Sequence, residues 1–404
     1  MELLSVRIGD APVAAGRVRL VGDVAYDDRP GQVETYWFEV PEKYADSLSR
    51  SGNPWLACLL PLAVTRGEPL RLCRPIDPVL AANAARLMET WKTWYPHLHV
   101  VPIEAEQAPP EGVGARETGA LFSGGVDSLF TLLRNGEQSD RTAFPAIDRL
   151  LLVWGFDLPL EKAEEFARLR GRLAEAAGEL GKELIDVATN LREVRFQEAL
   201  WGRLSHGSAL ASIALAFERR FSAVYIAATY SGGPAIKAWG SHPETDPLLS
   251  TSRLRIIHDG AGVERSEKTA YLSRSAVAMG SLHVCFRGLS ADNCSDCRKC
   301  YLTMLTLEVL GALSRSAAFR HEIDLARVAR IHVRGPVYAH LFRDIELRAR
   351  AAGRADIARA IARALRRYRR LKPVFTVLQW LGTKKGVWRL ARKLRVALLA
   401  DSPR

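Results

Sequence analysis

The sequence predicts an α/β protein with a parallel sheet in its central part. From about residue 115 to residue 310, short apolar segments alternate with segments of helical periodicity, which is typical of βαβ units with helices on both faces of a sheet. Segments of alternating polarity precede this part, and a basic segment with helical spacing follows it. We therefore expect an N-terminal α+β domain (1–114), the parallel-sheet domain (115–310) and a helical C-terminal extension (311–404).

The first part combines strand patterns with one helix. The stretches RVRLVGDVAY (17–26) and ETYWFEV (34–40) alternate apolar and polar residues, which predicts strands. The stretch PVLAANAARLMETWKTW (78–94) has the periodicity of a helix. The stretch EAEQAPPEGVGARE (104–117) is rich in Pro, Gly and Glu, and therefore predicts a linker.

The second part supplies the alternation itself. We expect strands at RLLLVWGF (149–156), ELIDVAT (183–189) and AVYIAATY (223–230), and helices at EKAEEFARLRGRLAEAAGEL (161–180) and SALASIALAFERR (208–220). Ligands of such sheets bind at the carboxyl ends of the strands. Residues that follow these strands are therefore candidates for a site.

Composition excludes several classes of protein. Of the 404 residues, 48% are apolar, so a disordered chain is excluded. The first residues, MELLSVRIGD, lack the basic-then-apolar pattern of a secretory signal, and the apolar run WLACLLPLAV is too short to cross a membrane. We therefore expect a cytoplasmic protein.

The positive charge is concentrated in the last part of the chain. The net charge is +12, yet from Arg343 onward 18 Lys and Arg stand against 4 Asp and Glu, so the rest carries about −2. The stretch from 358 to 400 also contains Phe375, Trp380, Trp388 and spaced leucines. Three interpretations stay open: binding to nucleic acid, binding to an anionic membrane, or packing of the apolar stripe with solvated arginines.

The stretch ALFSGGVDSLF (120–130) carries the clearest functional signal. Its first residues predict the end of a buried strand, and four apolar residues at helical spacing follow, namely Val126, Leu129, Phe130 and Leu133. Gly124 and Gly125 therefore lie at a strand-to-helix turn. Glycine lets a ligand approach the main chain closely, and the start of a helix attracts phosphate.

The side chains around these glycines suit a nucleotide. Ser123 and Ser128 supply hydroxyl donors, and Val126 begins the helix whose backbone N–H groups face the ligand. The carboxylate of Asp127 suits holding Mg²⁺ or capping the loop. The alternative is a tight turn with a helix cap and no ligand.

The pattern S-G-G-x-D-S is not a Walker A loop, because it has no lysine. It resembles the PP-loop of the ATP pyrophosphatases. The resemblance implies that ATP binds here and is cleaved between its α- and β-phosphates, with adenylation of a substrate. A second SGG, at 231–233, is followed by Pro234 and no helical pattern, and we expect it to be a loop near the ligand.

Four of the six cysteines are clustered with the spacing C-x8-C-x2-C-x2-C. This clustering indicates a metal site rather than a disulfide framework. Four thiolates suit structural zinc, an iron–sulfur cluster is the rival, and unligated cysteines are the third interpretation. We expect the two remaining cysteines, Cys58 and Cys73, to be buried. The clustered residues are Cys285, Cys294, Cys297 and Cys300.

A PP-loop followed by this cysteine spacing resembles the 7-cyano-7-deazaguanine synthase (QueC-like) family over about 115–310. The resemblance implies ATP, Mg²⁺ and structural Zn²⁺. It also implies adenylation of a small-molecule or protein-borne carboxylate, an ammonia or amine donor, and formation of an amide or nitrile. Lys268, in ERSEKTAYLSR, matches a lysine of that family in a similar helix-opening stretch and could offset phosphate charge. The first hundred residues, the basic tail and Ser295, where glycine is common, depart from the family.

Five further residues are candidates on weaker grounds. Asp157 follows the expected strand at 149–156 and could bind ribose or adenine. His206 could cap a helix or contact substrate, and solvation is the expected role of Arg265. A polar stretch, WGSHPETDPLLSTSRLRIIHDG, suits a substrate loop or a turn. Its candidates for substrate contact are Ser241, His242 and Asp246.

Three functions therefore stay open. The first is a carboxylate-activating enzyme of the kind just described. The second is a PP-loop enzyme that modifies tRNA by thiolation, which needs a reactive cysteine or an iron–sulfur cluster. The third is a nucleotide-binding regulator without catalysis. A homodimer is compatible with all three.

Overall fold

The computed structural model describes residues 1–11, 16–108, 117–229, 238–287, 289–333 and 335–382. The chain forms two compact units, Met1–Glu264 and Arg265–Arg404. This division differs from the three parts that the sequence predicts, with boundaries at 114 and 310. The expected linker lies largely outside the described residues.

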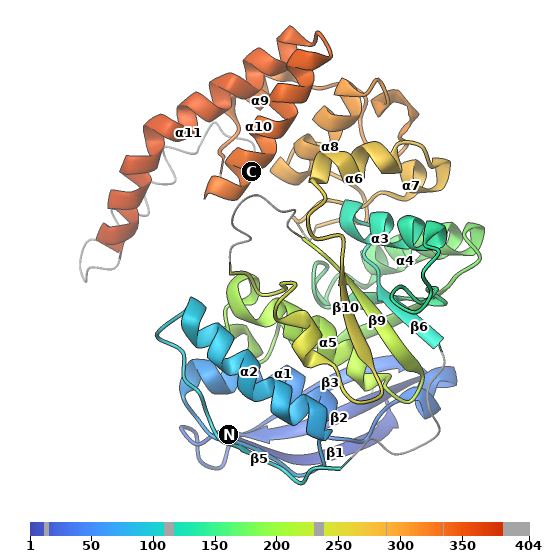
Figure 1. Ribbon diagram of the computed structural model, residues 1–404, viewed down its shortest axis with the longest axis vertical. Coiled ribbons are helices and arrows are strands. Elements are labelled where there is room, and N and C mark those ends of the chain that lie inside the picture. The colour runs from blue at the N-terminus through green and yellow to red at the C-terminus, as the bar shows by residue number, and fades with distance from the viewer. Residues whose placement is uncertain (12–15, 109–116, 230–237, 288, 334, 383–404) are drawn as a thin grey trace. The chain divides into compact units, whose positions relative to one another are not determined.

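Among the described residues, the first unit is built on one sheet of ten strands. Several of these strands are labelled in Figure 1. Their order in the sheet is β10-β9-β6-β7-β8-β3-β2-β1-β4-β5. Most neighbouring pairs are parallel, so the predicted α/β class is confirmed. The strands are β1 (Glu2–Asp10), β2 (Arg17–Ala25), β3 (Val33–Pro41), β4 (Leu70–Leu72), β5 (Ile103–Glu104), β6 (Glu117–Leu121), β7 (Arg149–Trp154), β8 (Glu183–Thr189), β9 (Phe221–Ala227) and β10 (Arg255–Asp259).

The five strands from β6 to β10 form a wholly parallel half of this sheet. Numbered along the chain, their spatial order is 5-4-1-2-3, so the chain reverses its direction of winding between β6 and β9. Ligands of doubly wound sheets bind outside the carboxyl ends of the strands at such a switch point. The switch point therefore marks where a site is expected.

The N-terminal strands join this parallel half through one short antiparallel contact. Phe38 of β3 pairs with Thr189 of β8, and Glu39 with Ala188. The Arg17 guanidinium crosses the seam, donating to the carboxylates of Glu39 and Asp186 at 2.7 Å each. One apolar cluster extends over both halves, so residues before and after the predicted boundary at 114 share a core.

Five helices complete the first unit within its described residues. They connect or flank the strands, and α1 is buried on nearly all sides because it packs against α5 and β4. A helix that is apolar all round belongs in a protein interior. The five are α1 (Asn53–Arg66), α2 (Pro78–Trp94), α3 (Val126–Glu137), α4 (Ala163–Glu179) and α5 (His206–Ala216).

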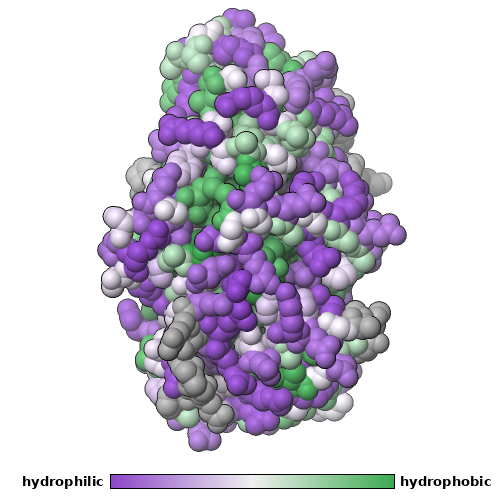
Figure 2. Space-filling view, turned by 90° about the vertical axis from the view of Figure 1, so that its right-hand side faces the viewer, coloured by the Kyte–Doolittle hydropathy of each residue, from purple (hydrophilic) through white to green (hydrophobic). Residues whose placement is uncertain are grey.

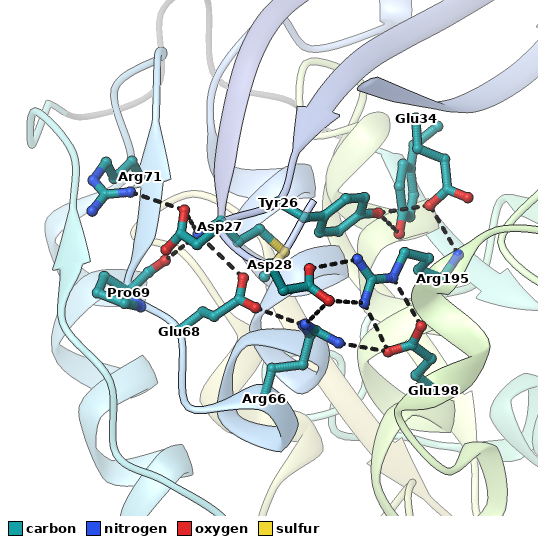
Figure 3. A network of polar contacts seen from close by, with 12 residues as sticks. Tyr26, Asp27, Asp28, Glu34, Arg66, Glu68, Pro69, Arg71, Arg195 and Glu198 are labelled. Carbon is teal, nitrogen blue, oxygen red and sulfur yellow. Dashed lines mark hydrogen bonds and ion pairs between the residues drawn. The ribbon is translucent and has the colours of Figure 1, made fainter. Parts of the chain in front are cut away.

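A charged network fixes the segment after β8 to the N-terminal part of the unit (Figure 3). The buried Arg195 guanidinium donates to both carboxylate oxygens of Asp28, at 2.9 and 3.1 Å, and to Glu198 at 2.8 Å. Arg66 contacts the same two acids at 2.5 and 3.0 Å. The guanidinium carbon of Arg195 also lies over the ring of Tyr26, 4.3 Å from the ring centroid, as in a cation–π contact. The network therefore joins three segments that are far apart in sequence.

The second unit is helical in its described residues. Helices α8 to α11 share one apolar core, in which Tyr301, Leu302 and Leu305 of α8 pack with residues of the later helices such as Phe342 and Ile361. The predicted boundary at 310 would divide this core. Residues before and after position 310 therefore belong to the same compact unit. The helices are α6 (Arg265–Leu272), α7 (Ala276–Ser281), α8 (Arg298–Val309), α9 (Leu325–Arg330), α10 (Gly335–Ala351) and α11 (Ala355–Gly382).

Among the described residues, no helix combines the length and apolarity needed to cross a membrane. Hydrophilic side chains predominate on the face drawn in Figure 2. The part of the basic tail from residue 383 lies outside the described residues.

Candidate nucleotide loop and candidate metal centre

The S-G-G-x-D-S stretch forms a loop between β6 and α3, as predicted from its pattern. Phe122 continues the strand by donating its N–H to the carbonyl of Leu151 at 2.8 Å. Gly124 then adopts a φ of 70°, in the left-handed region that side chains resist, and Gly125 precedes the first helical residue. The loop follows β6 and so lies at the switch point between β6 and β9.

Hydrogen bonds within the loop hold this conformation. The Gly125 N–H donates to Ser123 Oγ and the Ser123 N–H to Ser128 Oγ, both at 3.3 Å. Ser128 Oγ donates in turn to the Gly125 carbonyl at 3.2 Å. Ser128 is buried, whereas Ser123 is exposed. The loop therefore keeps its shape through its own contacts, and Ser123 remains accessible.

The first turn of α3 offers a group of backbone donors. The first helical hydrogen bond runs from the Leu129 N–H to the Gly125 carbonyl at 3.0 Å. The N–H groups of Val126, Asp127 and Ser128 consequently have no acceptor within the helix, and no side chain caps the helix at Gly125. Such a helix start attracts anions. Asp127 lies half-buried in the same turn.

Two strands hold α3 in place behind the loop. Thr131 Oγ1 donates to the buried Asp259 carboxylate of β10 at 2.7 Å, and Arg134 lies 3.7 Å from the same acid. The Asn135 amide donates to the hydroxyl of Tyr225 in β9 at 3.1 Å. Sequence reasoning did not single out Asp259, whose only signal was its position at the end of an apolar segment.

Asp157 lies after β7 and is exposed. The turn that carries it approaches the end of β8 closely, since a Cβ on Gly155 would lie 2.1 Å from the Thr189 carbonyl oxygen. Gly155 also has a φ of 101°, so only glycine fits there. Because carboxyl ends of parallel strands meet at one edge of a sheet, Asp157 lies at the same edge as the loop.

The structure brings Ser241, His242 and Asp246 together, but in the interior. Asp246 is fully buried and accepts hydrogen bonds from Ser241 Oγ at 2.6 Å and from the His242 N–H at 3.1 Å. The Nδ1 atom of His258 in β10 lies 2.7 Å from the same carboxylate. These contacts fix the stretch between β9 and β10. His258 was missed by sequence reasoning because its partner lies 12 residues away.

His206 is the first residue of α5 and lies against Trp201, with ring centroids 5.0 Å apart. The next residue, Gly207, donates its N–H to the Gly240 carbonyl at 2.5 Å. A Cβ on Gly207 would lie 2.3 Å from Asp246 Oδ1. The start of α5 therefore packs directly on the stretch that contains the other three substrate candidates.

Lys268 and Arg265 belong to the second unit, on α6. Lys268 is 1% exposed, which excludes the interpretation as a solvated lysine. Arg265 is half-buried. A lysine is buried only where polar or charged groups interact with its ammonium group. Lys268 therefore has a specific structural or chemical role.

The four clustered cysteines converge at the start of α8. Their sulfur atoms all lie within 4.8 Å of one another. The Sγ atom of Cys300 lies 3.4 Å from that of Cys297 and 3.9 Å from that of Cys294. A tetrahedral zinc site with Zn–S bonds of about 2.3 Å separates its sulfurs by about 3.8 Å. The cluster could therefore hold a metal ion such as zinc.

Asn293 and Ser295 shape the loop that carries the cysteines. The side-chain Oδ1 of Asn293 accepts hydrogen bonds from the N–H groups of Val284 and Cys285, at 2.8 and 3.1 Å. Ser295 has a φ of 52°, the one positive φ outside glycine among the described residues, which explains why glycine would suit this position. Sequence reasoning missed Asn293, because nothing in its spacing marks it as a partner of the cluster.

The thiols influence one another's ionisation. Hydrogen bonding with Cys285 lowers the pKa of Cys294 and raises the pKa of Cys300. One thiolate is stabilised by neighbouring S–H donors, whereas several charges so close together repel. A divalent cation removes this repulsion, because it binds all four as thiolates.

The two isolated cysteines differ. Cys58 is fully buried in α1, as predicted. Burial raises the pKa of its thiol. The prediction of a buried Cys73 is wrong, since this residue is exposed. It follows β4, whose Leu70 and Leu72 face the core, so the alternation of a strand turns Cys73 outward.

No protein-family model, no curated protein and no solved structure matches this chain. The second SGG, at 231–233, lies outside the described residues.

Proposed function

We propose that the loop from Ser123 to Ser128 binds the phosphates of ATP and that the protein adenylates a carboxylate. The observation that supports this proposal is the glycine turn at the start of α3, at the switch point between β6 and β9. The first backbone hydrogen bond of α3 is donated only by the Leu129 N–H, so the N–H groups that precede it at this helix start would be donors for the phosphates of ATP.

In the proposed reaction, a carboxylate oxygen attacks the α-phosphorus of ATP, and the bond to the bridging oxygen breaks. Pyrophosphate leaves with that electron pair, and an acyl adenylate forms. Ammonia or an amine then displaces AMP and gives an amide. Dehydration of the amide to a nitrile, as in the family that the sequence resembles, would consume a second ATP.

The residues of this chain would contribute through charge stabilisation. Negative charge builds up on the β- and γ-phosphates as pyrophosphate leaves, and the N–H groups and dipole of α3 stabilise it. The hydroxyl of Ser123 is accessible to donate to a phosphate oxygen. Asp127 would hold Mg²⁺ on the phosphates, because carboxylate oxygens are ligands that Mg²⁺ prefers.

The cysteine cluster would serve the fold rather than the reaction. Four thiolates complete a tetrahedral zinc site and leave no open position for a substrate. Three of the four cysteines are buried, and the fourth is half-buried. We therefore assign Zn²⁺ a structural role in the second unit.

The test is product analysis with the metal-loaded protein. Mg·ATP, ammonium and 7-carboxy-7-deazaguanine are supplied, and nucleotides and acyl products are followed by mass spectrometry. We expect AMP and pyrophosphate in equal amounts. Replacing Asp127→Asn should abolish AMP formation, whereas Glu137→Gln, an exposed acid at the other end of α3, should not change it.

Release of ADP and phosphate instead of AMP and pyrophosphate would contradict adenylation. Binding of ATP without turnover of any carboxylate would favour the regulator. Iron and acid-labile sulfide in the purified protein, in place of zinc, would favour the thiolation enzyme.

A further inference from the structure

The second unit carries a concentrated positive surface that the proposed adenylation does not use. Helix α11 repeats arginine at Arg359, Arg363, Arg366 and Arg370, which we call the arginine face. A helix turns about 100° per residue, so these four positions lie within about 60° of one another. All four are exposed.

Among the described residues, no acid forms an ion pair with the arginine face. Among the described residues, the acids of α10 and α11 form ion pairs with other arginines: Asp344 pairs with Arg348, and Asp356 pairs with Arg354. In the part of the chain that the structure describes, no ion pair of α10 or α11 includes a member of the arginine face. Four unscreened guanidinium groups along about 16 Å of helix therefore repel one another unless an external anion is present.

The surface around these arginines is hollowed rather than flat. Three adjoining hollows of about 460, 440 and 200 Å³ share Arg366 in their walls. Arg350 of α10 lines two of them, where it is paired with Glu346 at 2.5 Å, and Glu346 itself lines the smallest hollow. A groove between two arginine-bearing helices fits a narrow, strongly charged chain such as a phosphodiester backbone.

The other face of α11 is already occupied. Ile357, Ile361 and Leu365 are buried in the core of the second unit, so the helix has no apolar face free between Arg359 and Arg370. A helix that lies on a membrane needs such a face to enter the lipid. The groove therefore fits nucleic acid better than an anionic membrane.

The residue types indicate how a nucleic acid would be held. Arginine presents a planar fork of donors that matches phosphate oxygens, and all four members of the face are arginine rather than lysine. No aromatic residue is among the described residues that line the three hollows. Single strands are usually held by stacking on aromatic rings, so this lining favours a duplex.

We propose that the arginine face of α11, with the groove towards α10, binds the phosphate backbone of double-stranded nucleic acid without reading its bases. Each guanidinium contacts a phosphate and releases a condensed counterion. This binding does not depend on the proposed adenylation. It predicts strong dependence on salt and little dependence on sequence.

The test uses the full-length, metal-loaded protein and fluorescein-labelled duplexes of 20 base pairs, in RNA and DNA forms and in two unrelated sequences. Fluorescence anisotropy gives the affinity from about 50 to about 200 mM salt. A combined variant with Gln at all four positions of the arginine face should bind at least tenfold more weakly at 100 mM salt. Its slope of log K against log salt should be less steep by about 3 to 4, since each phosphate contact contributes about 0.9.

The matched control removes the same charge elsewhere, with Gln at four exposed arginines of the first unit: Arg29, Arg50, Arg86 and Arg219. The proposal expects the control to bind like the wild type and both unrelated sequences to bind alike. Equal loss in both variants, or unchanged binding by the α11 variant, would overturn it. Loss of binding to phosphatidylserine vesicles, with duplex binding retained, would assign the face to a membrane instead.

Discussion

Two helix starts, those of α3 and α8, carry the two candidate sites and are supported in different ways. Neither has a side-chain cap at the residue before its first turn, which is Gly125 for α3 and Cys297 for α8. The loop before α3 is closed by hydrogen bonds between its own serines and glycines, and α3 is fixed to β9 and β10. The loop before α8 instead gathers four thiols around a common centre.

This difference between the two loops indicates which of the two sites depends on a ligand for its shape. The loop before α3 keeps its shape through its own hydrogen bonds, so a nucleotide would bind a preformed site. The α8 loop brings together four thiols that repel one another once they ionise, and a cation bound among them would remove this repulsion. We therefore expect loss of the metal to unfold the second unit. We expect substitutions in the loop before α3 to leave the fold of the first unit nearly intact.

The largest effect should follow loss of the metal. The substitution Cys297→Ser should reduce the zinc content below one ion per chain. It should also abolish cooperative unfolding of the second unit, because structural zinc supplies about 10–16 kcal/mol of apparent folding free energy in small domains. Elemental analysis and limited proteolysis followed by mass spectrometry measure both effects. New cleavage sites should lie after residue 264, and the exposed Cys73→Ser is the matched control. Full zinc content in the Cys297 variant would contradict this expectation.

A smaller effect should follow loss of the charged network of the first unit. Arg195→Met leaves Asp28 and Glu198 without their main partner and should lower the free energy of unfolding by about 2 kcal/mol. This is less than for a fully buried pair, because both carboxylates are more than a third exposed. Urea unfolding measures the change. Arg170→Met, at an exposed arginine 3.5 Å from Asp186, should cost less than about 0.5 kcal/mol.

This network and a separate ion pair should both govern stability in acid. Hydrogen bonding from Arg195 lowers the pKa of Asp28 to about 2. Outside the network, hydrogen bonding from Lys43 lowers the pKa of Glu183 to about 2. Carboxylates with a lowered pKa stabilise the fold above their unfolded pKa of about 4, and this stability is lost as pH falls towards 2. The urea concentration at the midpoint of unfolding should therefore decrease as the pH is lowered from 6 to 2. This decrease should be smaller in Arg195→Met. A pH profile identical to that of the wild type would contradict a role of Arg195 in acid stability.

The smallest effect on stability should come from two glycines near the ends of α3, one in the loop before it and one in its last turn. Gly124→Ala places a side chain in the left-handed region and should cost about 1 kcal/mol. Gly136→Ala, at a helical position with open space around it, should stabilise by up to about 1 kcal/mol. Thermal unfolding monitored by circular dichroism distinguishes the two signs.

Local patterns predicted the elements that depend on neighbouring residues. The helix at 78–94 and the strand at 183–189 have the predicted bounds, because periodicity and flanking residues determine them. The strand–loop–helix arrangement around Gly124 and the convergence of the cysteines also follow from short-range spacing.

Features that depend on distant partners could not be predicted in this way. The contact between β3 and β8 involves two residue pairs separated by about 150 positions, and no periodicity marks it. The stretch containing Asp246 suited either a substrate loop or a turn, and nothing in its sequence indicated that Asp246 is fully buried beside His258 of the next strand. The extent of the second unit depends on a core shared by α8 and α11, which lie on opposite sides of the predicted boundary at 310.

The central claim is that the start of α3 is a preformed nucleotide site. Isothermal titration of Mg·ATP into metal-loaded wild type, Gly124→Ala and Gly136→Ala tests it most directly. We predict that the wild type and Gly136→Ala bind with the same Kd and that Gly124→Ala binds at least tenfold more weakly, since its backbone N–H groups are displaced from the phosphates. Equal affinity in all three proteins, or no binding by the wild type, would contradict the claim.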